Sequence, residues 1–344
     1  MRIHWRLPHG SDPPSPLGDC SLPDLARQIP FCREAEALGF DSLLIDFGID
    51  KADPLLLAAA LGMATTRMRF IIACRSGLTA PTMFVQQLNT LSTLIGGRFA
   101  LNVVAGSTPD EQRRYGDWAE HDERWERTDE FLTIARNLWR GGEHDFDGRW
   151  YRISKAAVKT PFRAHDGRQA PEIYVGGSSP AALAVARKHA DCSLMPVDVP
   201  ARIAAQVAPI LAAGKEAGIR ASVIARRTRA EALEAAESFR TSAPVDAPAR
   251  QRVHVDRSDS QMIRGAYARA ADEWPLPWLW KGAVRAYGAM SVAIVGSYDE
   301  VADALLAYRA AGVAQCILAG TPKLDEMRIF GAEVMGRVRA GVSA

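Results

Sequence analysis

The sequence predicts a (β/α)₈ barrel with insertions, and three features of the 344-residue chain lead to this prediction. Short apolar stretches with strand character alternate with helical stretches almost from end to end, as in parallel α/β folds. Several of the strands are continuous apolar runs, which is typical of strands covered on both faces. About eight such units in a chain of this length fit an eight-stranded barrel. An open doubly wound sheet is the second possibility.

Breaker residues set the limits of the elements in order along the chain. Gly39 ends the first helix, Pro54 and Pro81 open the next two, and Gly96-Gly97 ends the third, because proline suits the first helical position and glycine the position after the last. Asp147-Gly148 is a hairpin turn signal within 145–153. The expected barrel strands are 3–7, 40–46, 68–73, 99–104, 172–175, 192–195, 221–225 and 316–319, with a further strand at 292–295. The expected helices are 24–38, 55–65, 81–94, 123–138, 181–190, 201–217, 231–239, 299–311 and 323–339.

The alternation breaks between residues 242 and 289. This stretch contains prolines, charges and three tryptophans, Trp274, Trp278 and Trp280. A structureless run of this length is uncommon inside a compact domain unless it is a lid or a linker, and only 258–271 has helical spacing. We expect one domain over 1–344 with an irregular insertion at 242–289. The insertion is either an active-site lid, in which Trp278 to Lys281 close the pocket on a hinge at Gly282, or a packing surface.

Composition excludes several classes of function. Hydrophobic content of 48%, charged content of 24% and a net charge of +2 are ordinary for a soluble globular protein, and they give no reason to expect nucleic acid or a membrane as a partner. No apolar run is long enough to span a bilayer, and the first residues read as a strand rather than a signal peptide. The five cysteines are odd in number and include no CxxC pair. We therefore expect a cytoplasmic protein with reduced cysteines and no metal site.

The stretch Glu172-Ile173-Tyr174-Val175-Gly176-Gly177-Ser178-Ser179-Pro180 joins the fifth strand to a helix. Ser179 suits the N-cap and Pro180 the first helical position. The free N–H groups, the helix dipole and two hydroxyls would then point the same way and attract an anion. In a barrel, the loops after the strands form the active site. The sequence therefore predicts a phosphate cradle on the catalytic face, with an ordinary capped turn as the alternative.

Several motifs together resemble one known family. They are the segment from Gly97 to Ser107 (GRFALNVVAGS), His121-Asp122-Glu123-Arg124-Trp125, Glu130-Phe131, Phe146-Asp147-Gly148-Arg149 and the Gly-Gly-Ser-Ser loop. Their order and spacing resemble the bacterial luciferase-like flavin-dependent monooxygenases, and most of all the alkanesulfonate monooxygenase branch. The resemblance covers nearly the whole chain except 242–280.

The resemblance implies a barrel that uses reduced FMN, supplied by a separate NAD(P)H:flavin reductase, and O₂ to oxidise a small organic substrate. It also implies a homodimer or a homotetramer. Three alternatives stay open. The first is a deazaflavin-dependent oxidoreductase of the same superfamily, and the second is a flavin-binding barrel without turnover. The third is a phosphate-binding barrel isomerase or aldolase, for which the strands offer no catalytic lysine.

The resemblance also implies roles for particular residues. Asn102, Ala105 and Gly106 match positions that meet the flavin ring or ribityl chain, and Asp46 ends the strand that faces the ring. Gly177, Ser178 and Ser179 match the phosphate-binding turn. Trp125 stands where the family usually has a tyrosine whose hydroxyl reaches the phosphate. An indole N–H can donate one hydrogen bond but accept none.

For catalysis, the resemblance points to His9 after the first strand, Arg220 beside the seventh strand and Arg285 in the mobile loop. An arginine pair suits an anionic substrate or a peroxide anion, although both could instead form surface salt bridges. Other family positions differ: the cysteine after the second strand is missing, Ser222 replaces a histidine, and Thr321 replaces a tyrosine. We therefore expect a substrate other than a simple alkanesulfonate.

Overall fold

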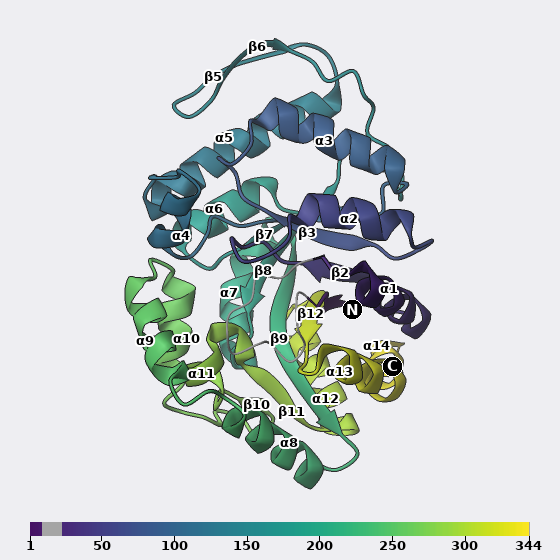
Figure 1. Ribbon diagram of the computed structural model, residues 1–344, viewed down its shortest axis with the longest axis vertical. Coiled ribbons are helices and arrows are strands. Elements are labelled where there is room, and N and C mark those ends of the chain that lie inside the picture. Colours follow the sequence, from purple (N-terminus) through teal and green to yellow (C-terminus); the bar gives the residue numbers. More distant parts are fainter. Residues whose placement is uncertain (9–22, 344) are drawn as a thin grey trace.

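The computed structural model of the chain describes residues 1–8 and 23–343, and it contains a closed barrel of eight parallel strands (Figure 1). Neighbouring strands follow the order β1-β2-β3-β4-β7-β8-β9-β12, and β12 pairs with β1 to close the ring. The strands are β1 (Arg2–Arg6), β2 (Ser42–Ile45), β3 (Phe70–Cys74), β4 (Phe99–Val103), β7 (Glu172–Gly176), β8 (Cys192–Pro196), β9 (Glu216–Arg226) and β12 (Gln315–Ala319). The predicted fold class is confirmed.

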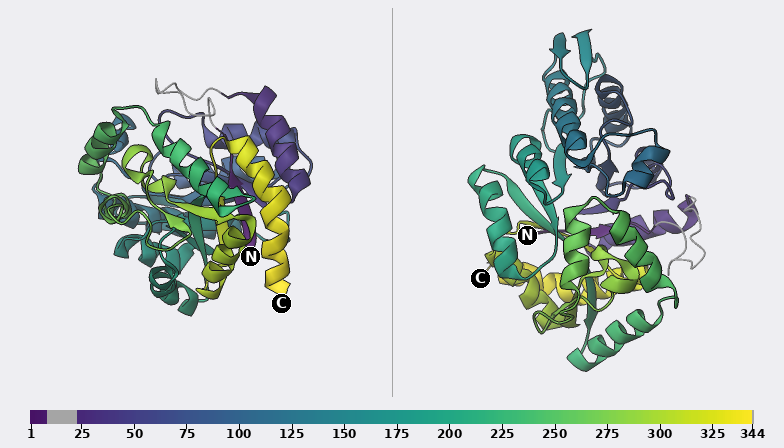
Figure 2. Two further views of the ribbon diagram at one scale, coloured as in Figure 1. Left: turned by 90° about the horizontal axis from the view of Figure 1, so that it is seen from below. Right: turned by 90° about the vertical axis from the view of Figure 1, so that its left-hand side faces the viewer.

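Helices surround this barrel (Figures 1 and 2). They include α1 (Leu25–Leu38), α2 (Pro54–Met63), α3 (Pro81–Leu94), α5 (His121–Arg140), α6 (Pro180–His189), α7 (Pro200–Ala212), α8 (Arg229–Thr241), α12 (Tyr298–Ala310), α13 (Lys323–Ile329), the π-helical turn η2 (Phe330–Val334) and α14 (Met335–Ser343). Side chains of Asp24, Asp53 and Ser297 accept N–H groups at three of the N-termini, as expected for N-caps.

The boundary between α7 and β9 differs from the prediction. We expected a helix to residue 217 and a strand from 221, whereas α7 ends at Ala212 and β9 already begins at Glu216. Gly214, with a φ of 69°, explains the early stop, because glycine readily takes the left-handed conformation that ends a helix. The predicted hairpin around Asp147-Gly148 is present as β5 (His144–Asp147) and β6 (Arg152–Ala156), beyond α3 and α5.

Alternate residues of each barrel strand point inward and form layers. The layer at the amino ends is ionic, the next is hydrogen-bonded, the third is apolar, and the layer at the carboxyl ends is polar again. The ionic layer contains Arg2, Arg69, Glu172 and Glu216, and the hydrogen-bonded layer contains His4, Ser42, Tyr174 and Gln315. The apolar layer contains Leu44, Ile71, Ala100, Leu194 and Ile317. The polar layer at the carboxyl ends contains Arg6, Asp46, Asn102 and Arg220. The apolar layer therefore separates the two polar ends of the barrel.

The segment 242–289, which we expected to be irregular, is largely ordered into helices. It contains α9 (Ala247–Arg257), α10 (Gln261–Arg269), the short strand β10 (Leu279–Trp280) and α11 (Val284–Tyr287). It continues through the 3-10 turn η1 (Ala289–Ser291) into β11 (Ala293–Ser297). β11 pairs with the second half of β9 beyond the barrel, and β10 pairs with β11. In Figure 1, α9 and α10 lie on the same side of the barrel as α4 (Pro109–Arg114).

Within the described ranges, no helix has the length and apolar character needed to cross a membrane. The same residues contain no group of three or more His, Cys, Asp or Glu side chains placed to hold a metal ion. Cys32, Cys74, Cys192 and Cys316 are all free thiols. The cytoplasmic location stays a prediction.

Candidate active site

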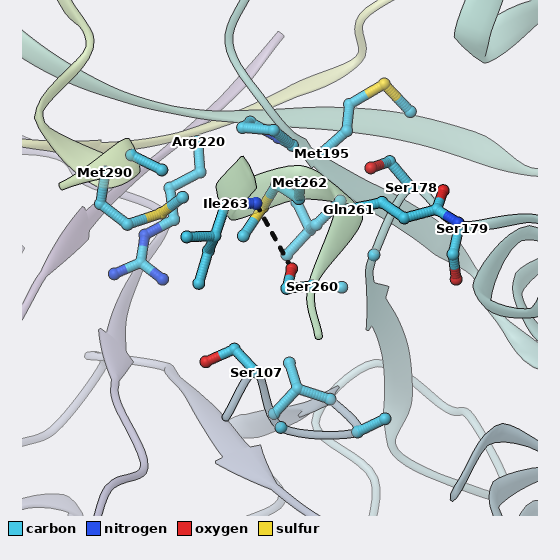
Figure 3. A pocket seen from close by; sticks show the side chains of 18 of the residues that line it. Ser107, Ser178, Ser179, Met195, Arg220, Ser260, Gln261, Met262, Ile263 and Met290 are labelled. Carbon is cyan, nitrogen blue, oxygen red and sulfur yellow. Dashed lines mark hydrogen bonds between the residues drawn. The ribbon is translucent and has the colours of Figure 1, made fainter. Parts of the chain in front are cut away.

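A cavity of about 360 Å³ lies at the carboxyl ends of the barrel strands (Figure 3). Its wall is built from the loops after β2, β3, β4 and β7, the start of α5, the end of β8, the middle of β9, and the inserted segment. Eight of the predicted site residues line it: Asn102, Ala105, Gly106, Trp125, Gly177, Ser178, Ser179 and Arg220. The carboxyl-end face is where a (β/α)₈ barrel carries its active site.

The turn from β7 into α6 has the conformation that the sequence predicts. Ser179 is the N-cap, its Oγ accepts from the N–H of Ala182 at 3.2 Å, and Pro180 opens the helix. A Cβ on Gly177 would lie 2.7 Å from the Cβ of Ala182 and 3.1 Å from the Trp125 ring. Only glycine allows α6 and Trp125 to pack this closely on the loop backbone. The N-terminus of α6 therefore begins directly after three residues that line the cavity, Gly177, Ser178 and Ser179.

Two buried polar atoms next to this turn have no hydrogen-bond partner among the described residues. They are the indole Nε1 of Trp125, a donor, and the amide Oδ1 of Asn102, an acceptor. Asn102 Oδ1 lies 3.3 Å from the position that a Cβ on Gly176 would take. Burying an unpaired polar group costs about 1–3 kcal/mol. A ligand that accepts from the indole and donates to the amide would remove this cost.

The turn after β4 also depends on a glycine. Gly106 has a φ of 85°, and a Cβ there would fall 1.9 Å from Nε2 of Gln112 in α4. Most residues avoid this φ, and a side chain would clash as well. Ala105 and Gly106 therefore expose a smooth backbone surface to the cavity.

A cluster of charged side chains lies next to the cavity, at the carboxyl end of β2. Asp46 is buried, with 6% of its surface exposed, and it accepts hydrogen bonds from Arg6 Nε and, at 3.1 Å, from Arg220 Nη2. Burial lowers the pKa of Arg220 and the charge of Asp46 opposes this, but a guanidinium stays protonated in proteins. Arg220 lines the cavity, while Asp46 is not part of its wall. Two arginines share one carboxylate, which leaves an excess positive charge here.

Two predicted catalytic residues are not placed in the cavity wall. His9 lies outside the described residues. Arg285 is exposed, and its guanidinium lies 5.5 Å from the centre of the Tyr267 ring. The expected closure by Trp278 to Gly282 is also absent in this form: Trp280 packs in a cluster with Ile224 and Val295, and none of these five residues lines the cavity.

The wall contains residues that the sequence analysis did not assign. Arg75 and His121 come from the loop after β3 and the start of α5. Gln251, His254 and Met262 come from the inserted segment, and Met290 comes from η1 at its end. Arg75 lies in a loop after a barrel strand, where the sequence places the active site, but no role was predicted for it. Gln251 and His254 had no such signal, since α9 was not predicted.

Comparison with known proteins agrees with this architecture. Residues 1–315 match the family model described as "Luciferase-like monooxygenase", so the chain belongs to this family. Among similar solved structures, an EDTA monooxygenase from Chelativorans sp. BNC1 is 18% identical with a TM-score of 0.79, over 99% of this chain and 93% of that chain. A riboflavin lyase solved with modified FMN and riboflavin is 18% identical (TM-score 0.72, 100% and 92%). An F420-dependent secondary alcohol dehydrogenase is also 18% identical (TM-score 0.69, 98% and 99%). Such low identities show a shared fold only.

Proposed function

We propose that the protein is a two-component flavin monooxygenase that uses reduced FMN and O₂ to oxidise a small organic substrate. The observation that supports this most is the cradle at the α6 N-terminus beside the unpartnered indole N–H of Trp125, in a chain of the luciferase-like monooxygenase family. A separate NAD(P)H:flavin reductase would supply the reduced FMN. The structure solved with modified FMN belongs to the same fold, which fits this choice of cofactor.

The residues of the cavity suit the parts of FMN. The phosphate would lie against the hydroxyls of Ser178 and Ser179 at the positive N-terminal end of α6, with a hydrogen bond from Trp125. Asn102 Oδ1 would accept from the flavin or its ribityl chain, and the surface of Ala105 and Gly106 would lie close to the ring. Reduced FMN, when bound, supplies the two electrons that activate O₂.

The charged residues of the site would stabilise negative charge that develops in the reaction. Arg220 presents a fixed positive charge to the cavity, which favours negative charge that develops there, and Asp46 together with Arg6 holds its orientation. His9 stays a predicted catalytic residue. Arg285 could reach a substrate only if the inserted segment moved, so its catalytic role also stays a prediction.

The inserted segment would exclude water from the reaction as a lid. Its turn between α9 and α10 is docked on the barrel, because Asp259 pairs with Arg124 at 2.7 Å and Ser258 Oγ donates to the carbonyl of Ser107 at 2.6 Å. In Figure 3, Met290 lies beside Arg220, and Met262 lies beside Ile263. Movement of the lid would therefore begin with the breaking of these two contacts.

Two finer assignments rest on the sequence motifs. The Gly97–Ser107 segment and the Gly-Gly-Ser-Ser loop favour the alkanesulfonate branch, while Ser222 and the missing cysteine after β2 favour a substrate other than a simple alkanesulfonate. A homodimer or homotetramer stays a prediction. A deazaflavin-dependent oxidoreductase is the second candidate, because one protein of the same fold is described as F420-dependent. A flavin-binding barrel without turnover is the third.

The test is to form the complex with reduced FMN without oxygen and then to add O₂. We expect the bound flavin to be oxidised at a rate different from that of free reduced FMN, while one hydrogen peroxide is still released per flavin because no substrate takes up oxygen. Reduced F420 is the matched comparator. Oxygen-independent hydride transfer from F420, without affinity for FMN, would contradict the proposal, and so would binding of reduced FMN with an unchanged oxidation rate.

A further inference from the structure

Arg75 is a buried cation in the cavity wall that the flavin assignment does not use. It follows β3, its side chain is 7% exposed, and it lines the cavity. Its guanidinium lies 4.7 Å from the centre of the Phe47 ring and 5.8 Å from that of Tyr115, at distances where a cation is attracted to an aromatic face. The two rings hold the guanidinium in place from the loop after β2 and from the end of α4.

The hydrogen bonds of Arg75 are only partly used. Nη2 donates to Glu111 at 2.8 Å, whereas Nε and Nη1 have no hydrogen-bond partner in the described part of the chain. Glu111 also accepts the N–H of Ile49 at 3.2 Å, so it is shared. An arginine with unused N–H groups is well suited to bind a carboxylate or a related oxyanion.

The charge of the cavity wall favours such a ligand. Among the described residues that line it, the charged side chains are Arg75 and Arg220, and none is a carboxylate. Arg220 shares Asp46 with Arg6, so its positive charge is only partly balanced. Together the two arginines make the wall attractive to anions.

Arg75 is separate from the phosphate cradle. It follows β3, the cradle follows β7, and β4 lies between them in the barrel. Two strand spacings correspond to roughly 10 Å. In Figure 3, Arg220 likewise lies across the cavity from Ser178 and Ser179. The guanidinium of Arg75 packs on Phe47 after β2, on the side of β3 away from the cradle. An anion at Arg75 is therefore a second anion and not the flavin phosphate.

We propose that Arg75 binds an oxyanion group of the substrate, which makes the substrate a small organic carboxylate or sulfonate. This inference deepens the proposed function and relies on it for placing the cofactor phosphate at the cradle. The roof of the cavity is apolar at Met262, Ile263 and Met290, and methionine adapts to ligands of different shape. The body of the substrate is accordingly apolar.

The test is calorimetric binding of three aromatic probes of similar shape, with and without saturating FMN. They are benzoate, benzenesulfonate and neutral benzamide. We expect the wild type to bind one or both anions at least tenfold more tightly than benzamide, and the tighter of the two identifies the head group. Arg75→Gln should lose at least tenfold in affinity for the anions, with unchanged affinity for benzamide and FMN.

Two variants serve as controls. Arg113→Gln removes the same charge from the exposed face of α4, where Arg113 packs on Trp118, and it should bind all probes like the wild type. Arg75→Lys keeps the charge and should retain part of the anion preference. This variant also tests the inference if Arg75→Gln does not fold. The inference is overturned if the wild type does not prefer the anions, if Arg75→Gln keeps that preference, or if Arg75→Gln loses affinity for FMN instead. A wild type that binds the anions but not FMN would overturn the proposed function alone.

Discussion

The two polar ends of the barrel interior are built from similar residues but differ in how their groups are paired. At the amino ends, Glu172 is 1% exposed, and it accepts two hydrogen bonds from Arg2, at 2.7 and 3.2 Å, and pairs with Arg69 at 3.0 Å. At the carboxyl ends, Asn102 Oδ1 and Trp125 Nε1 are buried without a hydrogen-bond partner in residues 1–8 and 23–343. A paired cluster stabilises the fold, whereas unpaired buried groups are retained where a ligand pairs with them. The comparison predicts that substitutions at one end change stability and at the other end change ligand binding.

The largest expected effect is on stability, from Glu172→Gln. Burial raises the pKa of Glu172, but the hydrogen bond from Arg2 and the charge of Arg69 outweigh this and lower it overall. Removing the charge leaves Arg69 without this carboxylate and Arg2 with only the exposed Glu216, and we expect a loss of about 3 kcal/mol in the free energy of unfolding, measured by urea denaturation. Affinity for FMN should not change.

Glu216→Gln is the matched control in the same network, because its side chain is 48% exposed. We expect it to cost less than about 1 kcal/mol. Equal losses of stability for Glu172→Gln and Glu216→Gln would contradict the stabilising role given to the ionic layer at the amino ends.

The next effect concerns the cradle. In Gly177→Val, the new side chain would collide with Ala182 and the Trp125 ring, since a Cβ alone would lie 2.7 and 3.1 Å from them. We expect at least about a 100-fold loss of affinity for reduced FMN, equal to about 2.7 kcal/mol, measured by anaerobic titration. Gly336→Ala, in α14, is the control: its Cβ would meet nothing within 4 Å, and its affinity should stay at the wild-type value.

The third prediction concerns pH and the hydrogen-bonded layer. Burial lowers the pKa of His4 to about 4, below the value of about 6.5 expected in the unfolded chain. Between these values the unfolded chain binds more protons than the folded protein, so stability is complete above about pH 7 and falls as the pH drops. We expect a loss of about 2 kcal/mol by pH 5. The difference between the unfolding curves of wild type and His4→Gln measures this, and identical pH slopes would contradict it.

The smallest expected effect is on FMN affinity, from the loss of one hydrogen bond donor at the carboxyl ends of the barrel. Trp125→Phe removes the buried N–H donor, and we expect about a tenfold weaker binding of reduced FMN, since a hydrogen bond to a charged group contributes about 1.5–3 kcal/mol. Trp125→Tyr restores a polar group that can donate and should recover part of the affinity. If Phe binds FMN as tightly as Trp does, the indole does not contact the phosphate.

Local signals in the sequence were sufficient for the barrel and the cradle. The helix cap at Ser179, the proline at position 180 and the apolar strands depend on interactions between residues close in sequence. Their structure can therefore be predicted without knowledge of tertiary contacts. α9 was not predicted because it contains Pro248 and several charged residues. It buries only Ala247 and Val255, so its sequence lacks the apolar spacing that indicates a helix. Proline there is compatible with a helix only because it lies in the first turn.

Contacts between distant strands could not be predicted. The pairing of Asp46 with Arg6 and Arg220 depends on the register of β1, β2 and β9 in the closed barrel. Similarly, the sequence shows aromatic residues near Trp280 but not that this side chain packs against β9 and β11 rather than over the cavity. The role of Arg75 depends on Phe47 and Tyr115, which come from other loops.

The most direct test of the central claim is the anaerobic titration of the protein with reduced FMN and with reduced riboflavin, which differ only in the phosphate. If the α6 N-terminus and the hydroxyls of Ser178 and Ser179 bind that phosphate, reduced FMN should bind at least about tenfold more tightly, because charge-assisted hydrogen bonds at this site contribute more than 1.4 kcal/mol. Equal affinities for the two flavins would contradict the account.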